Sequence, residues 1–158
     1  MLPVPKTIPA PDADPKPLMV LDTNLFVYAL EESEDSRCEI AREKVRSLMA
    51  FDSGGAVLVQ TMAELYQVMR SKYADPVIRK KCVDFLDNLV AVKTIPKINY
   101  TSKTLLSAVR LSQDHNLHFW DCLLIAAMKE NGISRIYTEN VKDFKGIEGI
   151  EAVNPFVK

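Results

Sequence analysis

The sequence predicts an α/β fold in which helices flank a parallel sheet of five strands. Short apolar runs alternate along the chain with longer segments whose apolar residues recur at every third or fourth position. The short runs are typical of buried strands, and the longer segments are typical of amphipathic helices. Residues that favour turns, such as Gly54-Gly55, Pro96 and Gly132, stand between the two kinds of segment. Strands that alternate with helices indicate a parallel sheet with right-handed crossovers.

The first strand is expected at residues 18–21, where an apolar run follows a proline-rich segment and ends at Asp22. An apolar run of this kind is typical of a strand that is buried on both faces. The other strands are expected at residues 56–59, 90–95, 135–138 and 151–153. Because ligands bind at the carboxyl ends of parallel strands, position alone makes Asp22 a candidate site residue.

Six helices are expected, because each segment carries an apolar stripe or a helix-end signal. They are predicted at residues 23–30, 36–50, 61–71, 77–89, 101–113 and 120–131, with a turn or a short helix at 141–144. Asp75-Pro76 is a typical helix start. The run from Cys122 to Met128 is apolar on every side, which predicts a central helix with little exposed surface.

Composition predicts one compact domain at residues 18–158. The chain has 158 residues, of which 47% are hydrophobic and 26% are charged, and this is enough for one ordinary core. Six of its nine prolines fall within residues 1–17, and such spacing prevents regular hydrogen bonding along a strand. Residues 1–17 are therefore expected to form a flexible tail, with an arm that docks on a partner as the alternative.

Charge, cysteines and hydropathy exclude several classes of protein. The formal net charge of -1 argues against a strongly basic protein that coats nucleic acid, although a local basic patch is compatible with it. Three distant cysteines do not indicate a disulfide framework or a cysteine metal site, so we expect buried, reduced thiols. No apolar run approaches the roughly 20 residues of a membrane span, and no signal peptide is recognisable. These features predict a soluble, cytoplasmic protein without a membrane partner.

Four carboxylates lie just after a predicted strand or at the start of a predicted helix, and these strands and helices should meet at one edge of the sheet. Asp22 ends the first strand, Glu64 opens the helix after the second strand, and Asp121 opens the central helix. Asp143 lies just past the fourth strand. Their repulsion in a partly dry cleft would be severe, and a divalent cation would offset it. Because all the donors are oxygen atoms, the set favours Mg²⁺ or Mn²⁺ over zinc, and such a site can hydrolyse phosphodiesters by activating water.

Each acid also has an ordinary structural interpretation. Asp121 could cap its helix or complement the helix dipole, Glu64 could lie on a solvated helix face, and Asp143 could be an ordinary loop residue. The four acids together therefore carry more weight than any one of them. No glycine-rich phosphate loop, nucleophile elbow or pairing of cysteine with histidine competes with the acidic set.

In chain order, these acids lie in segments that resemble the motifs of PIN-domain ribonucleases, in particular the VapC-like toxins of toxin-antitoxin pairs. The segments are Leu21-Asp22-Thr23-Asn24, Thr61-Met62-Ala63-Glu64-Leu65, Phe119-Trp120-Asp121-Cys122-Leu123 and Tyr137-Thr138-Glu139-Asn140-Val141-Lys142-Asp143-Phe144. The resemblance covers roughly residues 18 to 155.

The resemblance implies a Rossmann-like, three-layer α/β/α sandwich with a five-stranded parallel sheet. It also implies a Mg²⁺- or Mn²⁺-dependent endoribonuclease with an RNA substrate, a tendency to form homodimers, and an antitoxin protein that covers the site. By position, Asp22, Glu64 and Asp121 match the three principal acids of the family. Asp143 matches the acid near the last motif.

The last motif also carries the main departure from the family pattern. Asn24 and Thr138 match accessory polar residues that hold water or metal in the family. Glu139, however, adds an acid beside Asn140. The fourth group that faces the metal is therefore Asp143, Glu139 or neither.

Other residues near these acids have two interpretations each. A basic cluster could follow an RNA backbone near Glu64 or form an ordinary solvated face. The cluster consists of Arg70, Lys72, Arg79, Lys80 and Lys81. His115 and His118 could bind metal, but surface or hydrogen-bonding roles are favoured beside an all-carboxylate site. Trp120 could stack on a base, and packing beside the central helix is the favoured alternative.

The preferred hypothesis is hydrolysis of single-stranded or loop RNA by in-line attack of water. Asp22, Glu64 and Asp121 would hold the metal, and Asp143 would complete the site. One alternative keeps the fold but makes the protein a non-catalytic module that binds RNA or protein. A phosphatase with an aspartate nucleophile is disfavoured, because such enzymes need a second aspartate where this chain has Asn24.

Overall fold

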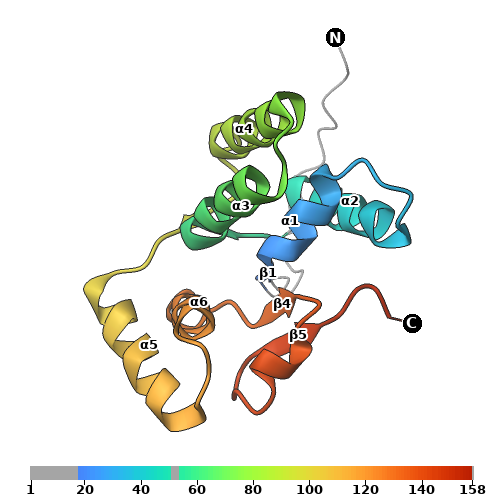
Figure 1. Ribbon diagram of the computed structural model, residues 1–158. Coiled ribbons are helices and arrows are strands. Elements are labelled where there is room, and N and C mark those ends of the chain that lie inside the picture. The colour runs from blue at the N-terminus through green and yellow to red at the C-terminus, as the bar shows by residue number, and fades with distance from the viewer. Residues whose placement is uncertain (1–17, 51–53, 158) are drawn as a thin grey trace, which may run out of the picture.

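The computed structural model describes residues 18–50 and 54–157, so the proline-rich segment at residues 1–17 lies outside the described residues. Short strands and longer helices alternate along the chain, which confirms the predicted α/β class (Figure 1). In order, the elements are β1 (Met19–Leu21), α1 (Thr23–Leu30), α2 (Ser36–Met49), β2 (Val57–Leu58), α3 (Val59–Lys72), α4 (Pro76–Ala91), β3 (Lys97–Ile98), α5 (Ser102–His115), α6 (Phe119–Glu130), β4 (Arg135–Tyr137), the 3₁₀ helix η1 (Val141–Phe144) and β5 (Glu151–Val153).

The strands form two parallel sheets that a single bridge connects. β4 lies between β1 and β5, and Val20 of β1 stands opposite Ile136 of β4. β2 pairs with β3 in a separate two-stranded sheet. Met19 forms an isolated parallel bridge with Gly55, and the Ala56 N–H donates to the Met19 carbonyl at 2.9 Å. The expectation of one five-stranded sheet is therefore met only in part, because β2 is two residues long and α3 begins directly after it.

The third strand lies further along the chain than predicted. The sequence predicts it at residues 90–95, but α4 continues to Ala91 and β3 occupies only two residues after Pro96. Pro96 has no N–H to donate, yet its carbonyl accepts a hydrogen bond from the Val57 N–H at 2.9 Å. The proline therefore opens the strand instead of ending it. Val90 is 60% exposed, so its apolar side chain was a poor indicator of a buried strand.

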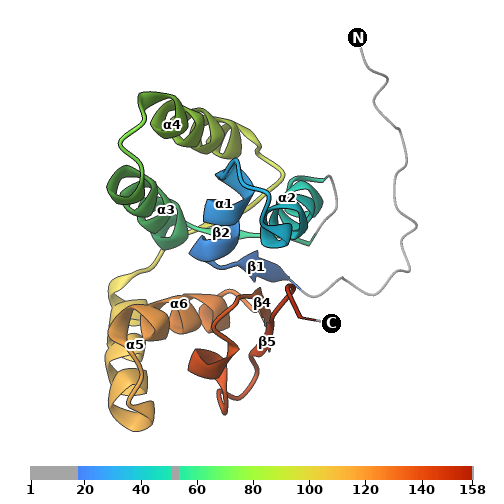
Figure 2. The same cartoon turned by 45° about the vertical axis from the view of Figure 1, so that its right-hand side comes forward.

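Helices cover both sides of the strands. Figures 1 and 2 show α1, α2, α3 and α4 on one side, with α5 and α6 on the other. Successive strand residues point to opposite faces, and the two cores follow this rule. Leu21 and Val57 pack with the first group of helices, whereas Val20 and Leu58 pack with α6. The layers are therefore helix, strand and helix, as the fold class predicts.

α6 is the central helix, as its apolar composition predicts. All seven residues from Cys122 to Met128 are buried. The three cysteines, Cys38, Cys82 and Cys122, are free thiols in buried positions, which confirms the expectation of reduced thiols. Within the described residues, no helix is both long and apolar enough to cross a membrane.

One buried hydroxyl provides a test of how the core is packed. Thr61 is 1% exposed, and its Oγ1 has no hydrogen-bond partner among the residues that the structure describes. Thr61→Val replaces this hydroxyl with a methyl group of similar shape and removes the cost of an unsatisfied polar group. We expect the free energy of unfolding to rise by about 1 kcal/mol, measured by urea denaturation.

The matched control is Thr104→Val. Thr104 is also fully buried, but its hydroxyl donates to Glu130 at 2.5 Å and accepts from the Thr101 N–H at 2.8 Å. This substitution should therefore lower the free energy of unfolding. Destabilisation by both substitutions would contradict the account of Thr61.

Candidate active site

Asp22 joins the end of a strand to the start of a helix. Its N–H donates to the Tyr137 carbonyl at 2.9 Å, which extends the pairing of β1 with β4 by one residue. Its Oδ1 accepts from the Thr23 N–H at 2.7 Å and so caps α1. Its Oδ2 accepts from the hydroxyl of the fully buried Thr138 at 2.7 Å. Both carboxylate oxygens are thus held by groups at the carboxyl ends of two neighbouring strands.

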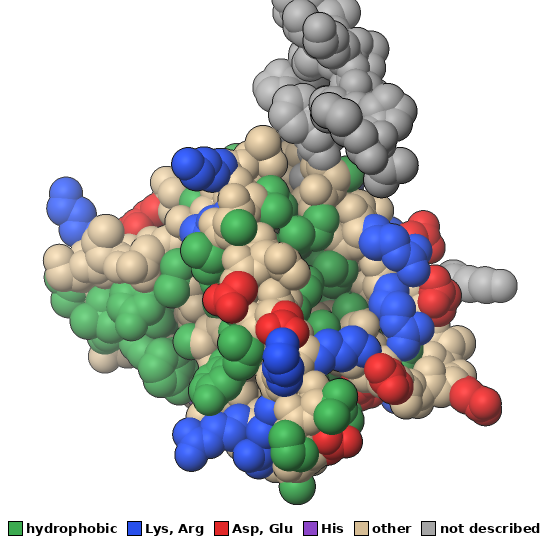
Figure 3. Space-filling view, turned by 90° about the horizontal axis from the view of Figure 1, so that it is seen from above, with side chains coloured by type: hydrophobic (Ala, Val, Ile, Leu, Met, Phe, Trp, Pro, Cys, Tyr) green, Lys and Arg blue, Asp and Glu red, His purple; other side chains and the backbone are tan. Residues whose placement is uncertain are grey.

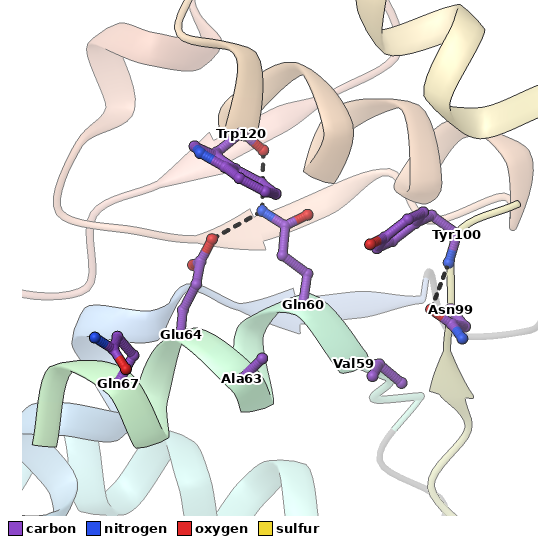
Figure 4. A pocket seen from close by; sticks show the side chains of 8 residues that line it. All are labelled: Val59, Gln60, Ala63, Glu64, Gln67, Asn99, Tyr100 and Trp120. Carbon is purple, nitrogen blue, oxygen red and sulfur yellow. Dashed lines mark hydrogen bonds between the residues drawn. The ribbon is translucent and has the colours of Figure 1, made fainter. Parts of the chain in front are cut away.

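Glu64 is connected to Asp22 through the intervening Thr23. The Thr23 hydroxyl donates to Glu64 Oε2 at 2.8 Å, across 41 residues of sequence. Gln60 lies one turn earlier on α3, and its Nε2 donates to Glu64 Oε1 at 2.9 Å (Figure 4). Thr23 therefore contacts both acids, because its N–H donates to Asp22 and its hydroxyl donates to Glu64.

Asp121 and Asp143 complete the group from the other side of the strands. Asp121 lies in the first turn of α6, and Asp143 lies in η1. Both are half-buried. Neither carboxylate accepts a hydrogen bond from another residue in the described ranges, so neither has the fixed orientation of Asp22.

The pKa values indicate that these acids form one electrostatic cluster. Burial raises the pKa of Asp22, and the charges of Glu64 and Asp143 raise it further, while the hydrogen bonds from Thr138 and Thr23 oppose the shift. Proximity of like charges has this effect on a carboxyl group. The acids predicted to meet at this edge from remote segments therefore act on one another.

Asp121 shows the same pattern. Burial raises its pKa, and the nearby charges of Asp143, Asp22 and Glu64 add to the increase. The charge of His118 acts in the opposite direction and lowers this pKa. Within the described residues, no lysine or arginine forms an ion pair with any of the four acids, so the cluster lacks a strong cation to balance it.

The donor set suits a divalent cation, although it is not arranged as a finished metal site. Carboxylate oxygens with a few hydroxyl oxygens are the ligands that Mg²⁺ and Mn²⁺ prefer. No group of three or more histidine, cysteine or acidic residues in the described part of the chain is placed to hold a metal ion as it stands. The carboxylates of Asp22 and Glu64 are instead engaged in hydrogen bonds with Thr138, Thr23 and Gln60.

Glu139 is engaged in a different network from the acidic cluster. Its Oε1 forms an ion pair with Arg37 at 3.0 Å, and its Oε2 accepts from the Tyr28 hydroxyl at 2.9 Å. Arg37 also pairs with Asp35 at 2.6 Å, and its guanidinium lies 4.6 Å from the centroid of the Tyr28 ring. This network fixes the turn after β4 to α1 and α2. Of the two candidates for the fourth acid, only Asp143 raises the pKa of Asp22 and Asp121.

The two predicted accessory residues differ in their contacts. Thr138 donates to Asp22 and accepts from the Asn140 N–H at 3.0 Å, so it holds the cluster to the last motif. Asn24 is half-buried in the first turn of α1. Its side chain forms no hydrogen bond with any residue that the structure describes.

Three of the five residues in the predicted basic cluster form ion pairs with acidic residues. Lys72, Lys80 and Lys81 pair with Glu31, Asp84 and Glu32. The Arg79 guanidinium donates to the backbone carbonyls of Tyr73 and Arg70. Figure 3 shows basic and acidic side chains interspersed on the face that it presents. These contacts favour the solvated-face interpretation of the cluster.

Sequence reasoning missed the roles of Thr23, Gln60 and a groove beside Glu64. Gln60 precedes Glu64 by four residues on a helix, a spacing that places two side chains on one face and could have revealed the pair. The groove has a volume of about 510 Å³. Its lining consists of Val59, Gln60, Ala63, Glu64, Gln67, Asn99, Tyr100 and Trp120. Trp120 is 51% exposed there, and its ring lies 5.6 Å from that of Phe119 at the start of α6, so it packs beside the central helix only in part.

The chain matches a known family model and shares its fold with solved structures. The model for the PIN domain matches residues 19–149. A toxin-antitoxin complex from Klebsiella pneumoniae aligns with a TM-score of 0.60 and 20% identity, over 87% of this chain and 98% of the other. VapBC2 from Rickettsia felis, bound to a DNA fragment from its promoter, aligns with a TM-score of 0.62 and 20% identity, over 87% and 98%.

A third solved structure is VapC20 from Mycobacterium tuberculosis, a toxin that cleaves the sarcin-ricin loop. It aligns with a TM-score of 0.62 and 13% identity, over 78% of this chain and 92% of the other. No curated protein sequence matches the chain. At these identities the likeness to the solved structures concerns the fold.

The raised pKa of Asp121 gives a stability test of the cluster. Because the pKa of Asp121 is higher in the folded chain than in the unfolded chain, ionised Asp121 lowers the free energy of unfolding. This loss is complete at neutral pH, and it is absent at a pH where Asp121 is protonated in both the folded and the unfolded chain. Asp121→Asn should therefore raise the free energy of unfolding at about pH 7 without divalent ions. This gain in the free energy of unfolding should shrink as the pH falls, and it should vanish below the ordinary aspartate pKa of 3.8. Urea denaturation at several pH values measures it.

Asp87→Asn is the control for this experiment. Asp87 is exposed on α4 and pairs with no other described residue. Its substitution should give no comparable gain at neutral pH. An equal gain from Asp87→Asn, or a gain from Asp121→Asn that persists at low pH, would contradict the conclusion that burial and the neighbouring charges destabilise ionised Asp121.

Proposed function

The chain belongs to the PIN domain family, and we propose that it is a Mg²⁺- or Mn²⁺-dependent endoribonuclease, the toxin of a toxin-antitoxin pair. The observation that carries the proposal is the acidic cluster, in which the Thr138 hydroxyl holds Asp22 and the Thr23 hydroxyl holds Glu64. Burial raises the pKa of Asp22 and Asp121 there, and the nearby like charges add to the increase. Partly buried carboxylates that repel one another destabilise a fold unless a cation offsets them. Perturbed acids of this kind are typical of functional sites.

The metal would be held by the four acids, with Asn24 and Thr138 as accessory groups. The acids are Asp22, Glu64, Asp121 and Asp143. When bound, the divalent ion would act as a Lewis acid that neutralises the phosphodiester and lowers the pKa of water. Because the hydrogen bonds of Asp22 and Glu64 occupy their carboxylates, we expect these side chains to turn toward the ion when it binds.

The protein groups would position the reactants around that ion. Thr138 would orient Asp22 and favour its ionised form, since the Thr138 hydroxyl donates to Oδ2. Thr23 and Gln60 would orient Glu64 in the same way. Asp121 has no fixed partner among the described residues and would be free to orient the water that attacks in line with the leaving oxygen.

The proposed substrate is single-stranded or loop RNA, and the proposed partners are an antitoxin and a second copy of the chain. The likeness to toxin-antitoxin proteins supports the antitoxin and the RNA. The exposed apolar side chains of Leu105, Leu106 and Val109 on α5 support a protein interface, because they gather on one helix and are 39 to 56% exposed.

One observation favours a second candidate, a non-catalytic PIN-fold module that binds RNA or protein. The carboxylates of Asp22 and Glu64 are already satisfied by hydrogen bonds, and the described residues include no finished metal site. Such a module would keep the fold and the charge cluster without hydrolysis. A cleavage assay separates the two candidates.

The test is cleavage of RNA by the purified chain with Mg²⁺ or Mn²⁺. We expect Asp22→Asn and Asp121→Asn each to reduce the rate by more than about 100-fold, because each removes a charge that would hold the ion. Thr138→Val should reduce it by about 10- to 100-fold, the usual cost of losing a group that orients a metal ligand. Sequencing the RNA ends reports both rate and cleavage site.

Asp87→Asn serves as the surface control and should cleave at the unsubstituted rate. Circular dichroism shows whether each variant is folded, so that loss of activity is scored only for folded chains. Unchanged activity in folded Asp22→Asn and Asp121→Asn would refute the proposed function.

A further inference from the structure

The groove beside Glu64 presents two exposed aromatic rings. Trp120 at the start of α6 is 51% exposed, and Tyr100 after β3 is 44% exposed. Figure 4 shows both rings across the groove from α3, with Gln60 reaching between them. Half-exposed aromatic rings that line a hollow offer flat surfaces for stacking.

The polar part of the lining consists mainly of uncharged amides. Gln60 donates through Nε2 to Glu64 and to the Trp120 carbonyl, at 2.9 and 3.0 Å, which leaves its Oε1 as an acceptor. Asn99 accepts from the Tyr100 N–H through Oδ1 at 2.9 Å, which leaves its Nδ2 as a donor. The Gln67 side chain forms no hydrogen bond with any described residue.

This chemistry suits a planar, neutral group that carries both donors and acceptors. The lining has no lysine or arginine to attract a phosphate, and its one charge is the carboxylate of Glu64. The volume of about 510 Å³ lies within the usual range for a small-ligand site. Nucleobases have this combination of a flat face and an edge of donors and acceptors, and single-stranded RNA exposes both.

We propose that this groove binds a nucleobase of single-stranded RNA, which stacks on Tyr100, lies close enough to Trp120 to quench its fluorescence, and is contacted at its edge by Gln60 and Asn99. Glu64 lines the groove and also belongs to the acidic cluster. A base in the groove therefore places an adjacent phosphate beside the carboxylates. That this phosphate is then cleaved rests on the proposed function, whereas binding of the base does not require hydrolysis.

Trp120 is the only tryptophan in the chain, so intrinsic fluorescence reports directly on this groove. The experiment titrates the full chain with short single-stranded oligoribonucleotides of A, C or U. EDTA prevents hydrolysis, and high ionic strength screens the repulsion between the phosphates and the acidic cluster. An abasic oligomer of the same length and charge is the control. We expect saturable quenching of Trp120 by at least one base-bearing oligomer and none by the abasic oligomer.

Tyr100→Ala should weaken binding of the quenching oligomer by about 5- to 150-fold, the range that loss of one stacking contact produces. Tyr66→Ala is the matched control, because Tyr66 is also 44% exposed but lies outside the groove on α3. Tyr66→Ala should bind like the unsubstituted chain. Asn99→Ala should change the preference among the three bases.

Three results would overturn the nucleobase site. They are no quenching by any oligomer, equal quenching by the abasic oligomer, and equal losses from Tyr100→Ala and Tyr66→Ala. Metal-dependent cleavage together with any of these results would leave the proposed function intact and refute the groove. Base-dependent quenching without cleavage under any metal would support the groove and refute the proposed nuclease.

Discussion

The hydrogen bond from the Thr138 hydroxyl to Asp22 Oδ2, at 2.7 Å, is the contact on which the rest of the site depends. It joins the carboxyl ends of β1 and β4, which are remote in sequence and adjacent in space. Through Asp22, the same contact supports the N-terminus of α1, where Thr23 reaches Glu64. A parallel strand pair and a helix cap thus bring the first and last motifs together.

In the site, two of the four acids are held by hydrogen bonds, and the acids repel one another. Asp22 and Glu64 are fixed by hydrogen bonds, whereas Asp121 and Asp143 accept none from described residues. Burial and mutual repulsion act against ionisation of Asp22 and Asp121. The network of Arg37 with Glu139 stabilises the turn after β4 without neutralising the cluster. The protein therefore maintains an unbalanced negative charge at one end of its strands, which a bound cation would relieve.

Much of this arrangement could be predicted from sequence, because it depends on local patterns. The strand before Asp22 and the buried helix after Asp121 follow from apolar runs, and their order predicts one shared edge. The position of β3 could not be predicted, because the apolar residues at 90–95 fit a helix end as well as a strand. The orientation of Glu64 and the exposure of Trp120 depend on contacts between α3 and α6, which no local pattern encodes.

The central claim is that a divalent ion relieves repulsion among these carboxylates. Carboxyl ¹³C NMR measures it directly, by titrating Asp22 and Asp121 with pH in the presence and absence of Mg²⁺. Without the ion, both pKa values should lie above the ordinary 3.8, and millimolar Mg²⁺ should lower both, because a bound cation favours the ionised forms. Raised pKa values that millimolar Mg²⁺ and Mn²⁺ leave unchanged would contradict the account.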